Sequence, residues 1–273
     1  MTAVAARLPA MDTVADSPQA RRLLAVCSSV LLIASTACGG GGSSRYADLT
    51  ADELFGQANE RFEGGDLGEA IQMLDRILVA HGDWNRVPDA RLMLGNVYFE
   101  RGDYLTARSE YSRFIDRYAG HPSSADAGLG ICKSLAALAP NPERDQGYTE
   151  EAITSCRNVV IDFAGNAASA EAARISNELR HTLAEKEFLT GEFYFRRNIW
   201  DAAIKYYEFV ANIYPESDYA AAALLGVYRA NLEIGYEDEA EAAIDLLLQR
   251  YPDSEAASQI NAERSSETGG ERG

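Results

Sequence analysis

The chain has 273 residues, of which 47% are hydrophobic and 25% are charged, and this composition is typical of a folded globular protein. Its formal net charge is −17, and a surface of this sign repels phosphate, so we expect no binding to nucleic acid. The four cysteines and three histidines are too scattered to predict a metal site, and the sequence predicts no cofactor.

The N-terminal residues indicate export from the cytoplasm. Two arginines precede an apolar run over residues 23–37, which is shorter than the roughly 20 residues of a membrane-spanning helix. Small residues end this run directly before Cys38, in a pattern that resembles a bacterial lipoprotein signal. We therefore predict a signal peptide over residues 1–37, lipidation of Cys38, and a flexible Gly/Ser tether over residues 38–45.

Two features of this segment leave alternatives open. Ser35 stands where lipoprotein signals usually carry leucine, three residues before the cysteine. The alternative is an ordinary secretory signal that is cut nearby and leaves Cys38 as a free thiol. Met11 is an alternative start that gives a shorter segment before the arginines.

From residue 46 onward the sequence repeats a helix–turn–helix pattern. The segments "EGGDLGEAIQMLDRIL" (63–78) and "ERGDYLTARSEYSRFI" (100–115) share their turn, anchor and apolar positions, and similar segments occur at 196–215 and 233–252. A small residue anchors each second helix, namely Ala70, Ala107, Ala152, Ala203 and Ala240. The predicted turn residues are Gly65, Gly102, Asn198 and Gly235. The unit length is close to the ~34 residues of a tetratricopeptide repeat.

These repeats predict an all-α fold. No segment alternates polar and apolar residues with a period of two, so we expect no sheet. The predicted architecture is a right-handed α-solenoid of about five tetratricopeptide-like hairpins over residues 46–260, because stacked units bury a core that no single unit could form. The polar residues 261–273 are expected to form a disordered tail.

The third unit is irregular and contains two cysteines. Cys132 lies in its predicted first helix and Cys156 in its second, at similar distances from the loop that joins them. An exported protein meets an oxidising compartment, which favours a disulfide between them. The alternative is two small buried thiols packed between the helices.

The sequence contains no recognisable catalytic motif. No histidine has a nucleophile or an acid at a catalytic spacing, and Gly128 and Gly130 lie in a helical pattern rather than after a strand. Because stacked repeats of this type present a curved surface, we expect a binding protein and not an enzyme.

Residues that face the inner side of the solenoid recur at helical spacing in the first helix of each unit. In units one and two they are apolar, Asn and Phe, and the candidate groove residues are Phe55, Asn59, Phe62, Leu92, Asn96 and Phe99. Asparagine can pair with the backbone of an extended peptide, and phenylalanine can form apolar pockets. The alternative for Phe62 and Phe99 is a place in the core between helices. Units four and five differ, with Glu192, Phe195 and Arg229, so a second ligand is expected there.

The complete pattern resembles the BamD family of outer-membrane β-barrel assembly lipoproteins. The resemblance includes "HPSSADA" (121–127), "RDQ" (144–146) and "LAEKEFLTGEFYFRRNIWDAAI" (183–204). The chain departs from the family at "HGDWNRVPDA" (81–90), which replaces the usual Tyr-Pro ending of the first unit, and at Asn198, which replaces a turn glycine.

The resemblance implies a periplasmic scaffold that is held on the outer membrane by a lipid anchor. Its C-terminal repeats, with Glu192, Phe195 and Arg229, would bind the POTRA region of a BamA-like barrel protein. Its N-terminal repeats would receive unfolded outer-membrane proteins through their aromatic-ended C-termini, and other assembly lipoproteins are further expected partners. The runner-up is a general periplasmic adaptor of the Tol-associated type. That family usually has a coiled coil before its repeats, whereas residues 39–44 here lead almost directly into the first unit.

Overall fold

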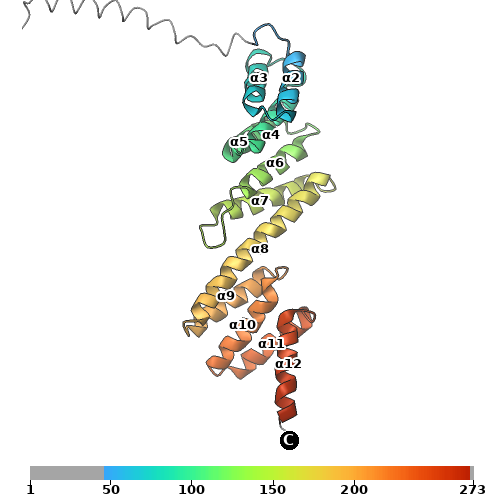
Figure 1. The fold of residues 1–273 in the computed structure, drawn as a ribbon. Helices are drawn as coiled ribbons and strands as arrows, with labels where there is room; N and C mark the ends of the chain where they lie inside the picture. Colours follow the sequence, from blue (N-terminus) through green and yellow to red (C-terminus); the bar gives the residue numbers. More distant parts are fainter. Residues whose placement is uncertain (1–45, 271–273) are drawn as a thin grey trace, which may run out of the picture. The chain divides into compact units, whose positions relative to one another are not determined.

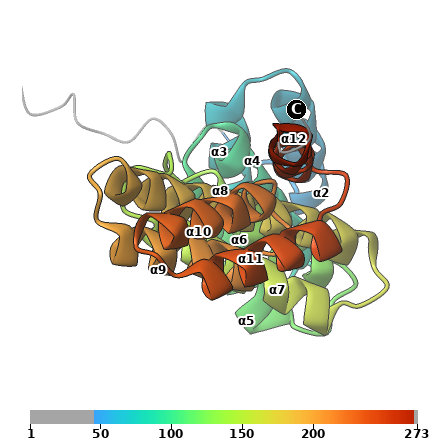
Figure 2. The ribbon, with the colours of Figure 1, turned by 90° about the horizontal axis from the view of Figure 1, so that it is seen from below.

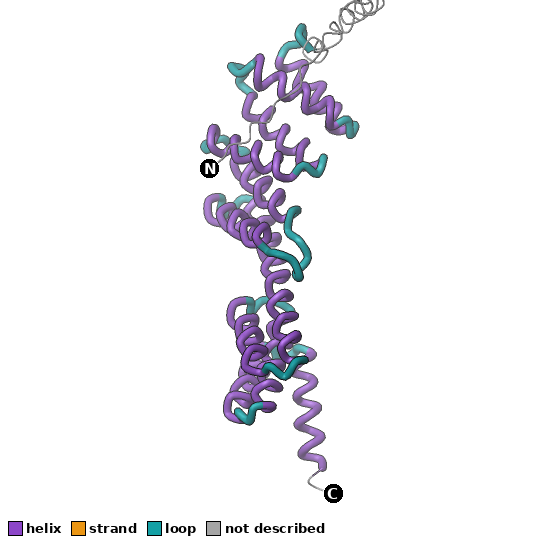
Figure 3. The backbone as a smooth tube through the Cα atoms, turned by 90° about the vertical axis from the view of Figure 1, so that its left-hand side faces the viewer, coloured by secondary structure: helices purple, strands orange, loops and turns teal. Residues whose placement is uncertain are grey.

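The computed structural model describes residues 46–270, which consist of helices and loops without a strand (Figure 3). The helices are α2 (Ala51–Glu63), α3 (Leu67–Ala80), α4 (Val87–Glu100), α5 (Tyr104–Tyr118), α6 (Ser124–Ala136), α7 (Gly147–Asp162), α8 (Ala167–Phe195), α9 (Trp200–Ile213), α10 (Tyr219–Glu233), α11 (Glu237–Arg250) and α12 (Glu255–Gly270). The predicted all-α class is confirmed. The residues from Leu49 onward form one compact unit.

The helices pair into five hairpins in chain order, α2–α3, α4–α5, α6–α7, α8–α9 and α10–α11 (Figure 1). The first helices of successive units also contact one another, α4 with α6, α6 with α8, and α8 with α10. These contacts place first helices side by side along one side of the stack, as an α-solenoid of helix hairpins requires.

The hairpin turns use the predicted residues. Gly65, Gly102 and Gly235 have φ angles of 78°, 83° and 78°, and Asn198 has a φ of 59°. Asparagine is one of the few residues with a side chain that adopt this left-handed conformation readily. Asn198 therefore makes the same turn that glycine makes in the other units.

The core lies between the helices of each hairpin and the first helix of the next unit. All five predicted anchor alanines are buried, with an exposed fraction of at most 1%. A small side chain at these positions lets helices approach closely, so larger residues such as Phe114 and Tyr207 fill the remaining space completely.

The first helix begins with a complete capping box. The Thr50 hydroxyl accepts a hydrogen bond from the Glu53 N–H at 3.3 Å, and the Glu53 carboxylate accepts one from the Thr50 N–H at 2.9 Å. These bonds hold the pKa of the Glu53 carboxyl below its usual range. The reciprocal bonds satisfy two backbone donors that a helix start otherwise leaves unpaired.

The helix α8 is the longest of the described helices. Its 29 residues run without a break from Ala167 to Phe195, and the positions predicted for unit four, Glu192 and Phe195, lie at its C-terminal end. The N-terminal half packs on α6 and α7, and the C-terminal half pairs with α9. The first half has no glycine or proline to end the helix, so one helix serves two units.

The last helix, α12, continues to Gly270, within the range of residues 261–273 for which a disordered tail is expected. Ion pairs join this helix to the preceding hairpin, Glu263 with Arg229 at 3.3 Å and Arg264 with Glu241 at 2.5 Å. Ile260 is buried. Figure 2 looks nearly along α12, whereas α10 and α11 lie across the view, so α12 runs steeply across the last hairpin.

The third hairpin contains a disulfide and an ordered loop. Cys132 of α6 and Cys156 of α7 form a disulfide in the structure, with their Cα atoms 4.8 Å apart. In the loop between α6 and α7, the side chain of Gln146 donates hydrogen bonds to the carbonyl oxygens of Asn141 at 2.8 Å and Arg144 at 3.1 Å. Gln146 is buried, so the "RDQ" segment organises this loop from within.

Candidate functional site

The first candidate site is a groove of about 310 Å³ built mainly by the first helices of units one to three. We call it the N-terminal groove, and it is lined by Phe62, Asn96, Phe99, Glu100, Tyr111, Asp126, Leu129, Gly130 and Lys133. Three of the six residues predicted for a groove, Phe62, Asn96 and Phe99, lie together here. Leu129 and Lys133 on α6 extend the site to unit three, for which no groove residue was predicted.

The N-terminal groove combines apolar walls with polar groups of both signs. The half-buried side chains of Phe62, Phe99 and Leu129 supply the apolar surface. Glu100 and Asp126 add carboxylates, and Lys133 adds an ammonium group that lies 3.8 Å from Glu171. Such a surface can accept an extended peptide, whose side chains need apolar pockets and whose backbone needs hydrogen-bond partners.

The two Phe residues of this groove are neither fully buried nor free of neighbours. Phe99 packs edge-on against Tyr104, with ring centroids 5.3 Å apart, and also lies against the core around Tyr111. Phe99 therefore both packs against neighbouring side chains and lines the groove.

Asn96 has a defined partner inside the protein. The hydroxyl of Tyr111 donates a hydrogen bond of 2.8 Å to Asn96 Oδ1. The ring of Tyr111 is buried against Gly95 of α4 and Gly130 of α6. Burial raises the pKa of the Tyr111 phenol, and Glu100 raises it further, so the hydroxyl keeps its proton and remains a donor.

The other three predicted groove residues do not line the N-terminal groove. Phe55 packs against Trp84 with ring centroids 5.5 Å apart, and the Arg86 guanidinium lies 4.5 Å from the Phe55 ring centre. Asn59 donates a hydrogen bond of 2.8 Å to Glu63. Leu92 packs against the core around Tyr111. Helical spacing alone does not determine which positions of α2 and α4 remain open, because neighbouring helices and the α3–α4 loop cover some of them.

The three residues predicted for a second ligand are each paired within the protein. Glu192 accepts a hydrogen bond from the Tyr207 hydroxyl and lies 3.7 Å from Arg196. Phe195 packs against Trp200 with centroids 4.9 Å apart. Arg229 pairs with Glu263 of α12. All three lie near Tyr207: the Phe195 and Tyr207 ring centroids are 6.4 Å apart, and the Arg229 guanidinium is close enough to act electrostatically on the Tyr207 phenol.

A second site that the sequence analysis did not predict lies on α8 and the α6–α7 loop. We call it the C-terminal cleft; its volume is about 350 Å³ and it is lined by Pro142, Glu143, Lys186, Leu189, Thr190, Phe193 and Arg196. Leu189 and Phe193 are 40% and 42% exposed, and both line this cleft. Lys186, Leu189, Phe193 and Arg196 follow one another at helical spacing in the sequence. The sequence does not show that the α6–α7 loop lies beside them and completes the cleft.

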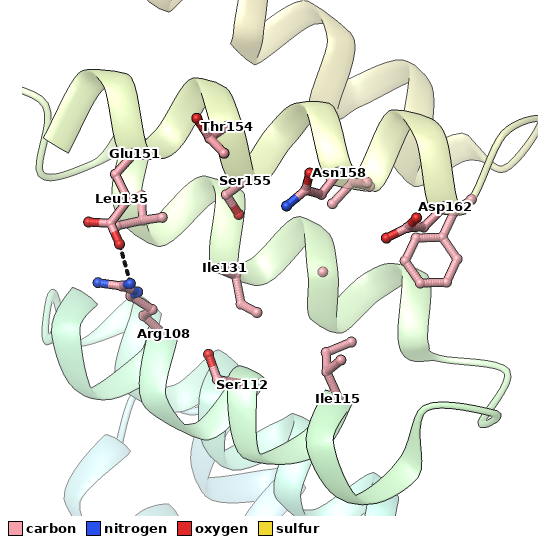
Figure 4. A pocket seen from close by; sticks show the side chains of 13 residues that line it. Arg108, Ser112, Ile115, Ile131, Leu135, Glu151, Thr154, Ser155, Asn158 and Asp162 are labelled. Atoms are coloured by element: carbon pink, nitrogen blue, oxygen red, sulfur yellow. Dashed lines mark hydrogen bonds and ion pairs between the residues drawn. The ribbon is translucent and has the colours of Figure 1, made fainter. Parts of the chain in front are cut away.

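A third hollow lies between the second helices α5 and α7, and residues of α6 also line it (Figure 4). Its volume is about 380 Å³, and Ile115, Ile131 and Val159 contribute to its lining. An ion pair between Arg108 and Glu151 joins α5 to α7 at its edge (Figure 4). This hollow was also not predicted, because it depends on small residues such as Ser112 and Ser155 that carry no functional signal in a sequence.

The remaining predictions concern the N-terminal segment, metal binding and membrane-spanning helices. The signal peptide, the tether and Cys38 lie outside the described residues. Within residues 46–270, no group of three or more His, Cys, Asp or Glu side chains is arranged to hold a metal ion. None of the described helices is both long and apolar enough to cross a membrane.

The sequence is similar to curated assembly factors over most of its length. The BamD outer membrane protein assembly factor of Caulobacter vibrioides is 26% identical over 237 residues, which cover 84% of this chain and 76% of that protein. The BamD of Rickettsia prowazekii is 24% identical over 232 residues, which cover 83% and 91%.

Among solved structures, a TPR2AB-domain complex of yeast Sti1 with a pHSP90 segment has a TM-score of 0.46 at 17% identity, covering 80% of this chain and 86% of that one. A tetratricopeptide repeat protein of Thermus thermophilus has a TM-score of 0.33 at 16% identity, covering 78% and 98%.

The YfiO family, described as an outer membrane lipoprotein family, matches residues 47–246. This range includes the N-terminal groove, the disulfide, the C-terminal cleft and the hairpins up to most of α11. The resemblance inferred from the repeats and the local motifs is therefore confirmed, and the chain belongs to the YfiO family of outer membrane lipoproteins.

Proposed function

We propose that this protein is a scaffold of the outer-membrane β-barrel assembly machinery. Its relatives carry the name of outer membrane protein assembly factors, and its helix hairpins offer binding surfaces rather than a catalytic cluster. Cys38 carries the lipid anchor in this proposal, and residues 39–45 connect it to the repeats. The scaffold is then held on the outer membrane and faces the periplasm.

The N-terminal groove is the proposed binding site for unfolded outer-membrane proteins. The observation that carries this assignment is that Phe62, Asn96 and Phe99, from two different units, line one open hollow together with Leu129 of a third. Aromatic walls fit the aromatic residue that ends such substrates, and Asn96 fits their backbone.

The C-terminal half is the proposed binding site for the POTRA region of the barrel-forming subunit. The exposed Leu189 and Phe193 lie between Lys186 and Arg196 in the C-terminal cleft. Exposed aromatic side chains and arginines are the residues that most often dominate protein–protein interfaces. Glu192, on the same helix, adds a carboxylate that lies 3.7 Å from Arg196 of this cleft.

Affinity purification from detergent-solubilised cell envelope tests this function. The proposal predicts recovery of a large β-barrel protein that carries POTRA domains, together with further assembly lipoproteins. Recovery of Tol components without such a barrel protein would contradict the proposal and would favour the general periplasmic adaptor. A parallel purification with the mature chain without lipid is the control. It identifies proteins that are recovered only because they lie in the same membrane.

A further inference from the structure

The ring of Tyr111 is fixed between two glycines of neighbouring first helices. A Cβ atom on Gly95 of α4 or on Gly130 of α6 would lie 2.6 Å from the Tyr111 ring. Such a distance is far shorter than a van der Waals contact, so only glycine permits the ring in this place. With 3% of Tyr111 exposed, the position of its hydroxyl is set by packing and not by solvent.

The fixed hydroxyl in turn sets the orientation of the Asn96 side chain. Tyr111 donates to Asn96 Oδ1 at 2.8 Å, and the raised pKa of the phenol keeps this donor protonated. The side-chain amide is planar, and its oxygen and its NH2 group branch from one carbon in different directions. When Oδ1 is bound to Tyr111, the N–H donors of Nδ2 are directed away from it, and they bond to no residue that the structure describes.

We propose that Tyr111 is a positioning residue that holds Asn96 with its N–H donors toward the N-terminal groove, where they bind a backbone carbonyl of an extended polypeptide. The inference rests on the proposed function of this groove and specifies how it recognises its substrate. Recognition of a carbonyl does not depend on the side chains of the substrate. It therefore suits a site that accepts many different unfolded chains.

The chain contains a second copy of the same arrangement with different chemistry. Tyr207 lies against Gly191 and Gly226, and its hydroxyl donates to Glu192. A carboxylate has no N–H to offer, so this second copy cannot donate to a carbonyl. Because Asn96 has N–H donors and Glu192 has none, only the N-terminal copy can bind peptide carbonyls in this way.

The experiment compares Tyr111→Phe with the wild-type chain and with Tyr118→Phe. The first change keeps the ring between the glycines and removes only the hydroxyl. Tyr118 is on the same helix and packs against Phe114, so Tyr118→Phe is a matched control. The probe is a short synthetic peptide with the C-terminal sequence of an outer-membrane β-barrel protein. We expect Tyr111→Phe to weaken peptide binding about fivefold and Tyr118→Phe to leave it unchanged.

A double-mutant cycle with Asn96→Ala separates positioning from general destabilisation. If Tyr111 acts through Asn96, the hydroxyl has no further effect once the amide is gone, so Tyr111→Phe should cause no additional loss in the Asn96→Ala background. Equal affinities of the wild type and Tyr111→Phe would overturn the inference, and so would additive losses. If the wild-type chain bound no peptide at all, the proposed function and the inference would both be refuted.

A measurement without peptide tests the positioning directly. Nuclear magnetic relaxation of the Asn96 side-chain amide in the full-length mature chain should show restricted motion in the wild type and faster motion in Tyr111→Phe. Equal mobility in both would overturn the positioning role and leave the proposed function of the groove intact. This readout distinguishes the failure of the inference from the failure of the proposed function.

Discussion

The hydroxyl of Tyr207 is bonded to Glu192 in the same way that the hydroxyl of Tyr111 is bonded to Asn96, and in both pairs the two residues are 15 positions apart. Each ring also lies between two glycines of successive first helices. The same packing arrangement therefore occurs twice in the structure. In each half of the stack it connects the core to a polar side chain on the inner side.

The glycines that pack against the two tyrosine rings should be important for stability. We expect Gly130→Ala to lower the free energy of unfolding by about 1–3 kcal/mol, because the added methyl group overlaps the Tyr111 ring. Thermal or urea unfolding measures the change. Gly56→Ala is the matched control, since its Cβ would meet nothing within 4 Å. That substitution should stabilise α2 by up to about 1 kcal/mol. A Gly130→Ala protein as stable as the wild type would contradict the packing described for Tyr111.

The disulfide between Cys132 and Cys156 should contribute to stability in an oxidising compartment. The two cysteines are 24 residues apart in the sequence, and cross-links of this span stabilise folded proteins by about 3 kcal/mol. Unfolding with and without a reductant should reveal that difference. A Cys132→Ala, Cys156→Ala double variant should not respond to the reductant. Alkylation of both native thiols without prior reduction would show that the bond is absent in solution.

Phe193 should contribute strongly to binding of the barrel subunit. Its ring is 42% exposed in the C-terminal cleft, with the Arg197 guanidinium 3.5 Å from its centre. We expect Phe193→Ser to weaken binding of the isolated POTRA region by about 2 kcal/mol, which is typical of an aromatic hot spot. Phe209 on α9 is 45% exposed, so Phe209→Ser controls for the loss of an exposed aromatic ring elsewhere. Unchanged affinity in Phe193→Ser would remove the cleft from the interface.

Cys38 should determine the attachment to the membrane. Lipid chains anchor proteins that have no spanning helix, and each buried methylene contributes about 0.8 kcal/mol. Cys38→Ser should therefore move the protein from the membrane fraction to the soluble periplasmic fraction, as measured by fractionation and immunoblotting. Retention of this variant on membranes at high salt would contradict lipidation at Cys38.

The sequence predicted most of the local structure because the repeat leaves a signature in each unit. Anchor alanines and turn residues have strict steric requirements, so Ala203 and Asn198 could be assigned from pattern alone. The full extent of α8 was not inferred, although the sequence contains no glycine or proline between Ala167 and Leu189 that would end the helix. The ion pairs of α12 with α10 and α11 could not be predicted, because they join residues far apart in the sequence.

The functional surfaces were predicted less completely. Helical spacing placed Asn96 on the inner side, but it could not show that Tyr111 would bond to its amide, because that contact joins two helices. It also could not show that Trp84 would pack on Phe55 from the α3–α4 loop. The C-terminal cleft depends on Pro142 and Glu143 lying beside α8, and such loop positions carry no periodic signal.

The most direct test of substrate binding in the N-terminal groove is site-specific photo-crosslinking in cells. A photoreactive residue in place of Leu129 lies in the groove, and one in place of Thr154 lies at the hollow between α5 and α7 (Figure 4). We predict crosslinks to newly made outer-membrane β-barrel proteins from position 129 and none from position 154. Crosslinks of equal yield from both positions, or none from position 129, would contradict binding of unfolded substrates in this groove.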